Sequence, residues 1–388
     1  MSKWEKVRLG DICTLKSGKS LNEEILIDHG EIPYIKVSDL SIRNNTFRIT
    51  CSTRYVNRKD VENQLFPKGT TVFPKRGGAI ATNKKRITSC EVCADLNIMG
   101  VIPGEKILPE YLYAYFQKID LGMLGNGSSV PQINNGDIAP LQIPLPPLDI
   151  QILIAKAVAT TAEVLAMRKQ QLAELDNLIK SIFYDMFGDP FANEKGWLQK
   201  QLSSYCLINP RKAEINVLSD DLQISFVPMQ SVSESGEIDT SDIREYKDVK
   251  SGFTYFYEND VLFAKITPCM ENGKGAIARN LKNNIGFGST EFHVLRPIEG
   301  ISNSEWLYRL TSLPTFRRNA EKNMSGSAGQ KRVPTSFFEK CIVPLPPIEL
   351  QNQFADIVAK IEEQKALVKK AIDETQLLFD SLMSEYFG

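Results

Sequence analysis

The chain contains Pro144-Leu145-Pro146-Pro147-Leu148-Asp149-Ile150-Gln151, and 200 residues later it contains Pro344-Leu345-Pro346-Pro347-Ile348-Glu349-Leu350-Gln351. Both copies run without a gap to a Phe-Gly pair, and between these ends apolar residues recur at alternating steps of four and three. That spacing is a heptad seam sustained for about five heptads, and it predicts two long helices packed as an antiparallel coiled coil. The seam residues are Ile154, Val158, Leu165, Leu172, Leu175, Ile179, Ile182 and Met186, then Phe354, Val358, Ile361, Val368, Ile372, Phe379, Leu382 and Tyr386.

Local chemistry sets the ends of both predicted helices. The paired prolines cannot continue a helix backwards, and Asp149 or Glu349 lies where the helix dipole favours a carboxylate. Gly188 suits a left-handed stop, and Pro190 prevents further helix. With roughly 35 residues at about 1.5 Å each, either helix spans some 50 Å, so we interpret the pair as a spacer. Polar residues interrupt the seam, a common way to fix register and partner: Thr161, Arg168, Lys365 and Thr375.

The duplication extends beyond the helices. The stretch from Trp4 to Leu9 reappears from Trp197 to Leu202, and three shorter motifs recur at offsets between 190 and 200. Two copies are too few for a solenoid and favour a pseudo-twofold molecule. Short β-like runs separated by Gly, Asn and Pro, each set followed by one or two helices, indicate α+β domains with a mostly antiparallel or mixed sheet. The predicted order is a domain at 1–143, a spacer helix at 144–189, a similar domain at 190–343 and a second spacer helix at 344–388.

Composition places the chain among soluble globular proteins. Its 388 residues suffice for two or three domains, and 42% hydrophobic and 24% charged residues are ordinary values. The seven cysteines include one close pair, Cys90 and Cys93, and with only two histidines we expect no metal site. No signal peptide is recognised, and the most apolar run carries Lys156 and Glu163. We therefore expect a cytoplasmic, reduced protein with no membrane contact.

The net charge of −1 leaves little room for strong non-specific DNA binding by the chain alone. Its distribution is uneven, however. Residues 1–149 carry 19 basic and 16 acidic side chains, and residues 190–349 carry 19 of each, whereas the second spacer helix is acidic. Any polyanion would therefore have to meet the two domains rather than the spacer.

Both domains become basic and glycine-rich at equivalent points. Residues 75–86 hold five cations and no acid, and residues 265–275 combine lysine, glycine and asparagine; small-residue loops at 127–132 and 326–332 precede the helices. Glycine allows close approach, Lys and Arg neutralise phosphates, and Asn, Gln, Thr and Arg read base edges. The alternatives are solvated turns with surface lysines and plain linkers. The candidate DNA-binding residues are Lys75, Arg76, Asn83, Lys84, Lys85, Arg86, Gln132, Lys265, Thr267, Asn272, Lys274, Gln330, Lys331 and Arg332.

No catalytic constellation is recognised in the sequence. Two histidines and no Ser–His or Cys–His grouping argue against a hydrolase triad, and the Gly-Lys-Gly at 273–275 lacks the spacing of a phosphate-binding loop. Asp189-Pro190-Phe191 and Asn209-Pro210-Arg211 only faintly match an amino-methyltransferase motif, and we interpret both as turns. A binding subunit fits the sequence better than an enzyme.

The duplicated Pro-Leu-Pro-Pro-x-x-x-Gln start of a long helix, its Phe-Gly end and the Trp-x-x-x-x-Leu start of each half resemble the specificity (S) subunit of type I restriction–modification systems. The resemblance covers essentially the whole chain, and residues 266–275 look like one common version of the second target-recognition domain. It implies two such domains, each reading one half of an asymmetric bipartite DNA site.

The resemblance also implies partners. The helices would set the spacing and dock two modification (methyltransferase) subunits, which carry the S-adenosylmethionine chemistry, and restriction (translocase/nuclease) subunits would join them. This chain itself would bind no cofactor. Two alternatives stay open: a self-contained DNA methyltransferase or nuclease, and a protein adaptor with no role on DNA. Because such domains diverge most where they read bases, our candidate residues depend on loop chemistry.

Overall fold

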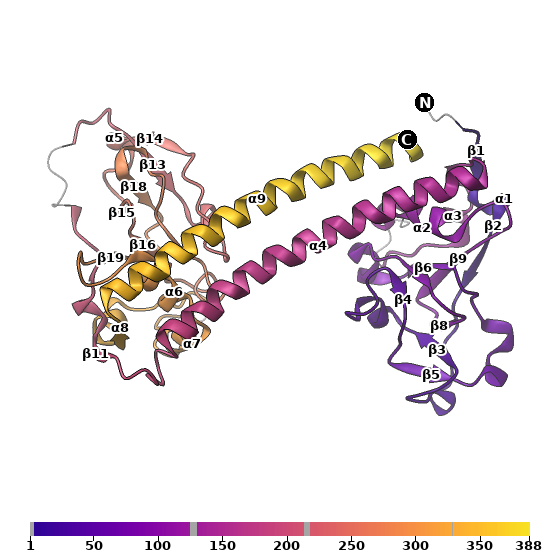
Figure 1. Ribbon diagram of the computed structural model, residues 1–388, viewed down its shortest axis with the longest axis horizontal. Helices are drawn as coiled ribbons and strands as arrows, with labels where there is room; N and C mark the ends of the chain where they lie inside the picture. Colours follow the sequence, from indigo (N-terminus) through magenta and orange to yellow (C-terminus); the bar gives the residue numbers. More distant parts are fainter. Residues whose placement is uncertain (1–3, 125–129, 213–217, 328) are drawn as a thin grey trace. The chain divides into compact units, whose positions relative to one another are not determined.

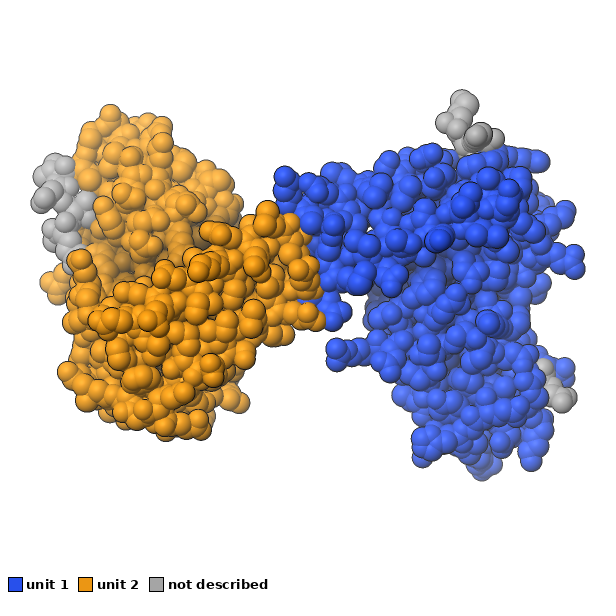
Figure 2. All heavy atoms as spheres, in the orientation of Figure 1, with its two compact units in different colours: residues 1–170, 370–388 blue, residues 171–369 orange. Residues whose placement is uncertain are grey.

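The computed structural model describes residues 4–124, 130–212, 218–327 and 329–388. The chain divides into two compact units, residues 1–170 with 370–388 and residues 171–369, which Figure 2 shows in blue and orange. Each unit therefore contains one α+β domain, the start of one long helix and the end of the other.

The described residues of the first unit form a domain with three sheets. Figure 1 shows its strands and helices in the indigo and purple part of the chain. The strand orders are β1-β10, β2-β9-β6-β7-β4 and β5-β3-β8. The strands are β1 (Lys6–Arg8), β2 (Cys13–Ser17), β3 (Ile32–Ile35), β4 (Arg48–Ile49), β5 (Arg54–Val56), β6 (Thr71–Pro74), β7 (Arg86–Thr88), β8 (Cys93–Ala94), β9 (Ile98–Pro103) and β10 (Gln142–Pro144). The helices are α1 (Leu9–Ile12), α2 (Pro109–Lys118) and α3 (Asn135–Ile138), with short 3-10 turns that include η2 (Val37–Ser41), η5 (Gly77–Thr82) and η6 (Leu121–Leu124).

The domain of the second unit also has three sheets, in the orders β11-β20, β12-β19-β16-β17 and β14-β13-β18-β15. The strands are β11 (Leu198–Gln201), β12 (Cys206–Ile208), β13 (Gln223–Val227), β14 (Ile243–Glu245), β15 (Thr254–Tyr257), β16 (Val261–Ala264), β17 (Gly275–Ile277), β18 (Ile285–Gly288), β19 (Phe292–Pro297) and β20 (Ile342–Leu345). The helices are α5 (Tyr246–Val249), α6 (Ser304–Ser312), α7 (Pro314–Lys322) and α8 (Thr335–Lys340), with the 3-10 turn η9 (Met229–Ser231) among the shorter elements.

The two domains share one topology. The row β2-β9-β6-β7 of the first corresponds to β12-β19-β16-β17 of the second, and the parallel pair β3–β8 corresponds to β13–β18. The sequence echoes fall on equivalent elements, because residues 32–35 form β3 and residues 224–227 lie in β13. The predicted α+β class with a mixed sheet is confirmed. The two copies are not identical in the described residues, since α7 follows α6 in the second domain, whereas η6 follows α2 in the first.

The predicted long helices are α4 (Leu148–Phe187) and α9 (Ile348–Phe387), each continuous over 40 residues. In the first unit, Ile154 near the start of α4 shares a core with Phe387 at the end of α9. In the second unit, Phe187 at the end of α4 stacks edge-on against Phe354 near the start of α9, with ring centroids 5.3 Å apart. In both units the start of one long helix contacts the end of the other, so the predicted antiparallel pairing is confirmed.

None of the predicted seam residues is exposed. The stripe of buried apolar residues is, however, wider at the carboxyl end of each helix than the predicted seam. Phe183 and Phe187 on α4, and Met383 and Phe387 on α9, are buried although they were not assigned to the seam. At these ends each helix packs on a domain as well as on its partner helix, and a globular core takes a broader apolar face than a two-helix seam.

The polar interruptions of the seam are paired. In the first unit, Arg168 donates to the hydroxyl of Thr375 and to the carbonyl of Ala371. In the second unit, the ammonium of Lys365 lies 2.7 Å from Asp176 and 2.9 Å from Glu362. A one-turn slip of the helices would leave these buried groups unpaired, so they favour a single register.

By length and composition alone, α4 is apolar enough to cross a membrane, and among the described residues it is the one helix that is. This is weak evidence, because core helices of soluble proteins meet the same criterion. Here its apolar stripe packs against α9 and against both domain cores.

The glutamine of the duplicated motif locks the start of each long helix. Gln151 is fully buried: its amide oxygen accepts from the Leu108 N–H at 2.9 Å, and its amide nitrogen donates to the carbonyls of Lys106 (3.0 Å) and Pro146 (2.9 Å). Gln351 makes the same three bonds, to the Asn303 N–H (2.9 Å) and to the carbonyls of Ile301 (3.1 Å) and Pro346 (2.8 Å). One side chain thus ties the helix start to the loop that precedes α2 or α6.

We predict that Gln351→Met lowers the free energy of unfolding of the second unit by about 2–4 kcal/mol, because a main-chain N–H and carbonyls would stay buried without partners. Urea denaturation followed by tryptophan fluorescence measures this. The matched control is Gln364→Met, an exposed position on the same helix, which should change stability by less than about 0.5 kcal/mol. Equal effects of the two substitutions would contradict the role of the buried amide.

We also predict that Phe354→Ala lowers stability by about 3–5 kcal/mol, because it empties a space lined by Phe183 and Phe187. Trp306 belongs to the same core and reports its unfolding by fluorescence. The control is Leu367→Ala on the same helix, where the side chain is 69% exposed and a change near zero is expected.

Candidate nucleic-acid interface

Each domain brings three segments together. The first segment, which we call the hairpin loop, connects β6 to β7 at residues 75–85 and β16 to β17 at residues 265–274. The second, the flanking loop, precedes α3 at residues 130–134, or α8 at residues 323–327 and 329–334. The third is the 3-10 turn that follows β3 in the first domain (η2) or β13 in the second (η9).

Main-chain bonds join the hairpin loop to the flanking loop in both domains. In the first domain, the Gly77 N–H donates to the Pro131 carbonyl and the Ile133 N–H to the Lys75 carbonyl, both at 2.8 Å. In the second domain, the Thr267 N–H donates to the Lys331 carbonyl at 3.0 Å and the Val333 N–H to the Lys265 carbonyl at 2.9 Å. The two loops predicted separately from sequence therefore form one surface in each domain.

A lysine joins the 3-10 turn to this surface. Lys84 donates to the hydroxyl of Ser41 in η2 at 2.7 Å, and Lys274 donates to the carbonyl of Met229 in η9 at 3.4 Å. Both lysines come near the end of the hairpin loop, so the two domains make an equivalent contact with different acceptors.

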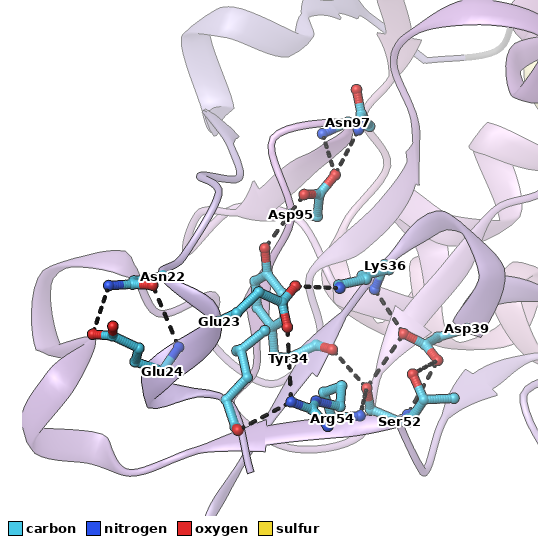
Figure 3. A network of polar contacts seen from close by, with 12 residues as sticks. Asn22, Glu23, Glu24, Tyr34, Lys36, Asp39, Ser52, Arg54, Asp95 and Asn97 are labelled. Atoms are coloured by element: carbon cyan, nitrogen blue, oxygen red, sulfur yellow. Dashed lines mark hydrogen bonds and ion pairs between the residues drawn. The ribbon is translucent and has the colours of Figure 1, made fainter. Parts of the chain in front are cut away.

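The turn η2 is itself fixed by a polar network, drawn in Figure 3. Asp39 is fully buried and accepts from the Lys36 N–H at 2.7 Å, from the Thr53 N–H at 3.1 Å and from the Ser52 hydroxyl at 3.3 Å. These bonds cap η2 and hold it against the segment that leads into β5. Without them Ser41 would lose its defined place beside the hairpin loop.

In the first domain, Arg76 is exposed and its guanidinium donates to the Gln132 amide oxygen, from Nε at 3.2 Å and from Nη2 at 3.0 Å. Lys75 is half-buried and donates to Ser17 at 2.7 Å; burial, and then the charge of Arg76, lowers its pKa. Arg76 and Gln132 thus form a polar pair at the surface, with donors that a ligand can engage.

Three of the predicted residues in the first domain have internal roles instead. Asn83 takes a left-handed conformation (φ 53°), and its side-chain oxygen accepts from the Leu121 N–H at 3.0 Å. Lys85 is 3% exposed and its ammonium donates to the Ile119 carbonyl at 2.6 Å. Arg86 donates to the carbonyls of Leu40 (2.9 Å) and Lys85 (2.6 Å) and also bonds Asn45. All three side chains bond main-chain groups of the same domain, although only Lys85 is buried, Arg86 being half-buried and Asn83 exposed.

In the second domain, Asn272, Gln330 and Lys331 are exposed, whereas the guanidinium of Arg332 forms a bidentate pair with Glu291 at 2.8–3.2 Å. The Arg332 pair lowers the pKa of the Glu291 carboxyl. Thr267 bonds the Lys331 carbonyl through its hydroxyl at 3.3 Å, and burial lowers the pKa of the half-buried Lys265. Residues 127–129 and 328 of the predicted flanking loops lie outside the described residues.

Sequence reasoning missed several residues that shape these surfaces, namely Asp39, Ser41, Glu291, His293 and Arg317. His293 lies in β19, where its Nε2–H donates to the Val333 carbonyl at 2.7 Å and Nδ1 lies 3.1 Å from the Asn209 amide nitrogen. Burial lowers the pKa of this imidazole to about 4, so it is neutral at pH 7. A lone histidine in a strand carries no spacing signal, and its partners are 84 and 40 residues away.

The chemistry of these surfaces is hydrogen bonding and charge. Among the residues that the structure describes, no three His, Cys, Asp or Glu side chains are grouped to hold a metal ion. Burial raises the pKa of the Cys13 and Cys93 thiols to about 11, which disfavours reactive thiolates at these positions.

A family model for the type I restriction modification DNA specificity domain matches this chain over residues 1–177 and again over residues 195–376. These ranges coincide with the two structural repeats described above, each with part of its long helix. The chain therefore belongs to the family of type I restriction–modification DNA specificity domains.

Named specificity subunits are among the relatives. That of the EcoAI enzyme from Escherichia coli is 39% identical over 201 residues, which are 50% of this chain and 33% of that protein. That of the MjaIX enzyme from Methanocaldococcus jannaschii is 22% identical over 98% of this chain and 91% of the relative. The chain thus spans only about a third of the EcoAI subunit and nearly all of the MjaIX subunit.

The fold also matches solved structures. The type I restriction–modification S subunit from M. genitalium superposes with a TM-score of 0.57 at 13% identity and covers 100% of this chain and 96% of its own. A chain from a structure on complex assembly and conformational transition of the type I system gives 0.55 at 18% identity, with 99% and 97% covered. At these identities the likeness concerns the fold.

The neutral His293 predicts a pH dependence of the second domain. Its pKa is about 4 when folded and 6.5 as a free side chain, so the unfolded chain binds more protons between these values and stability rises with pH across that window. Below pH 4 the loss approaches at most about 3 kcal/mol. Urea denaturation from pH 4.5 to 7.5 should show this slope in the native protein and a shallower one in His293→Gln. The control is His29→Gln, because His29, the other histidine, is exposed.

Proposed function

We propose that this chain is the DNA specificity subunit of a type I restriction–modification complex, in which each domain reads one half of an asymmetric bipartite site. The observation that carries the proposal is the repeated three-segment surface: the same hairpin loop, flanking loop and 3-10 turn occur in both domains with different exposed side chains. Equivalent scaffolds with different exposed side chains suit two half-sites of different sequence.

The exposed groups match the chemistry of base edges and phosphates. Arg76 and Gln132 supply a guanidinium and an amide in the first domain, and Asn272, Gln330 and Lys331 supply amides and an ammonium in the second. Arginine pairs with guanine, and asparagine or glutamine pairs with adenine, in bidentate geometry. The two domains are close to neutral in charge, so partner subunits would supply much of the phosphate contact.

The long helices offer a surface for those partners. Six apolar side chains of α4 and α9 are more than half exposed, although the seam between the helices is covered. Such side chains on a long helix are available for contact with a partner protein, because burying them there removes apolar surface from water. We propose that they dock two modification subunits, which hold S-adenosylmethionine, and that restriction subunits join this cytoplasmic assembly. The six residues are Ile152, Leu153, Met167, Leu367, Leu377 and Leu378.

The test is methylation in cells that express this chain with a modification subunit of the same restriction–modification system. Long-read sequencing should show methylation at one bipartite sequence, and Arg76→Ala should alter preference or occupancy at one half only, by about tenfold, whereas Lys331→Ala should act on the other half. A control is Lys59→Ala, an exposed cation outside the three segments. Methylation without a defined sequence would contradict the proposal.

Two alternatives give different results in the same system. A self-contained methyltransferase would bind S-adenosylmethionine without partners, so calorimetric titration of the isolated chain should show no heat of binding if our proposal holds. A protein adaptor would form the complex but leave no footprint on DNA. Footprinting with the purified complex should instead protect the methylated sequence.

A further inference from the structure

The guanidinium of Arg317 lies buried behind the hairpin loop of the second domain. Arg317, on α7, is 7% exposed, and no carboxylate within the described residues forms an ion pair with it. Its plane lies over the Phe263 ring, with the guanidinium carbon 3.9 Å from the ring centroid. It donates only to main-chain oxygens in its described contacts: Nε to Thr311 (2.9 Å), Nη1 to Met270 (3.3 Å), and Nη2 to Gly273 and Lys274 (3.2 Å each).

A second buried cation lies at the equivalent place in the first domain. Lys85 belongs to the hairpin loop itself and donates to the Ile119 carbonyl, just after the end of α2. Thr311 likewise lies in the last turn of α6, the helix equivalent to α2. The two donors belong to different elements, since Lys85 is in the hairpin loop and Arg317 is on α7. Both nevertheless join the hairpin loop to the carboxyl end of a helix, which is α2 in the first domain and α6 in the second.

Physical chemistry explains why these cations stay in place. The last carbonyls of a helix have no partner within it and lie at the negative end of its dipole, so a cation there is favourable. Burial lowers the pKa of Lys85 to about 8 and that of Arg317 to about 10, so both groups remain charged at pH 7. A buried charge that lost these bonds would be costly, so the loop carbonyls are held in position.

The loop that Arg317 holds presents its opposite side to solvent. Its three contacts in the loop are carbonyls of residues 270, 273 and 274, which flank the exposed Asn272. The side chain of Lys274 joins the same loop to η9. A displacement of about 1 Å in a reading group is enough to weaken a directional interaction strongly.

We infer that Arg317 and Lys85 are positioning residues that set the sequence discrimination of the two half-sites independently, each through its own hairpin loop. The inference rests on the proposed function above. It names the groups that would make the loops rigid enough to distinguish bases, rather than the groups that touch DNA.

The experiment is long-read methylation mapping in cells that express the full chain with its modification subunit. Arg317→Met keeps most of the packing on Phe263 but removes the four bonds. We expect it to lower discrimination between the native half-site and single-base variants about tenfold at one half, with the other half unchanged. Lys85→Met should have the reciprocal effect, and Arg317→Lys should restore part of the discrimination. The matched controls are Arg318→Met and Lys68→Met, both at exposed positions, which should leave the sequence profile unchanged.

The outcomes distinguish failure of the proposed function from failure of the positioning role. If the native complex methylates no defined sequence, the proposed function fails and the inference with it. If the native complex is specific, but Arg317→Met leaves the profile unchanged or reduces methylation equally at native and variant sites, the positioning role is overturned.

A second measurement covers the case in which Arg317→Met does not fold. Amide hydrogen exchange of the full chain carrying Arg317→Lys should accelerate at residues 270–274 relative to Arg318→Lys. Unchanged exchange there would overturn the inference.

Discussion

The packing of the last turn of each long helix into a domain core is the constraint on which the rest of the structure depends. Phe387 lies against Tyr111 and Tyr115, with ring centroids 5.2 and 5.7 Å away, and Phe187 lies against Phe354. The first unit is therefore complete only when residues 370–388 join residues 1–170. Because Phe387 is part of the core of the first domain, the stability of that domain depends on a helix that starts in the other unit.

The last carbonyls of the two helices accept hydrogen bonds from side chains of different elements. Trp197 donates its indole N–H to the Phe187 carbonyl at 2.9 Å, and Lys118 donates its ammonium to the Phe387 carbonyl at 2.5 Å. The buried glutamines at the helix starts, by contrast, make the same three bonds in both copies. The duplicated scaffold has thus kept identical chemistry where one side chain must satisfy several main-chain groups at once.

In the candidate nucleic-acid interfaces, main-chain bonds are shared between the two domains and side chains are not. Their framework is shared, since main-chain bonds pair the hairpin and flanking loops in both domains, but the exposed groups differ. Main-chain bonds do not depend on side-chain identity, so a loop fixed in this way tolerates substitution at its surface. This is the property that a family of proteins needs if its members share a fold and recognise different sequences.

The sequence by itself determined the duplication, the two long helices with their ends, the α+β class and the place of the basic loops. It could do so because heptad spacing, proline, glycine and a 200-residue echo are local or periodic signals. It could not separate Arg76 from Lys85, since both are cations in one basic loop. Only the tertiary structure placed one at the surface and the other beneath it, because burial depends on where the residues after α2 lie. The roles of Arg317, His293 and Asp39 were likewise decided by partners distant in sequence, for which no local pattern exists.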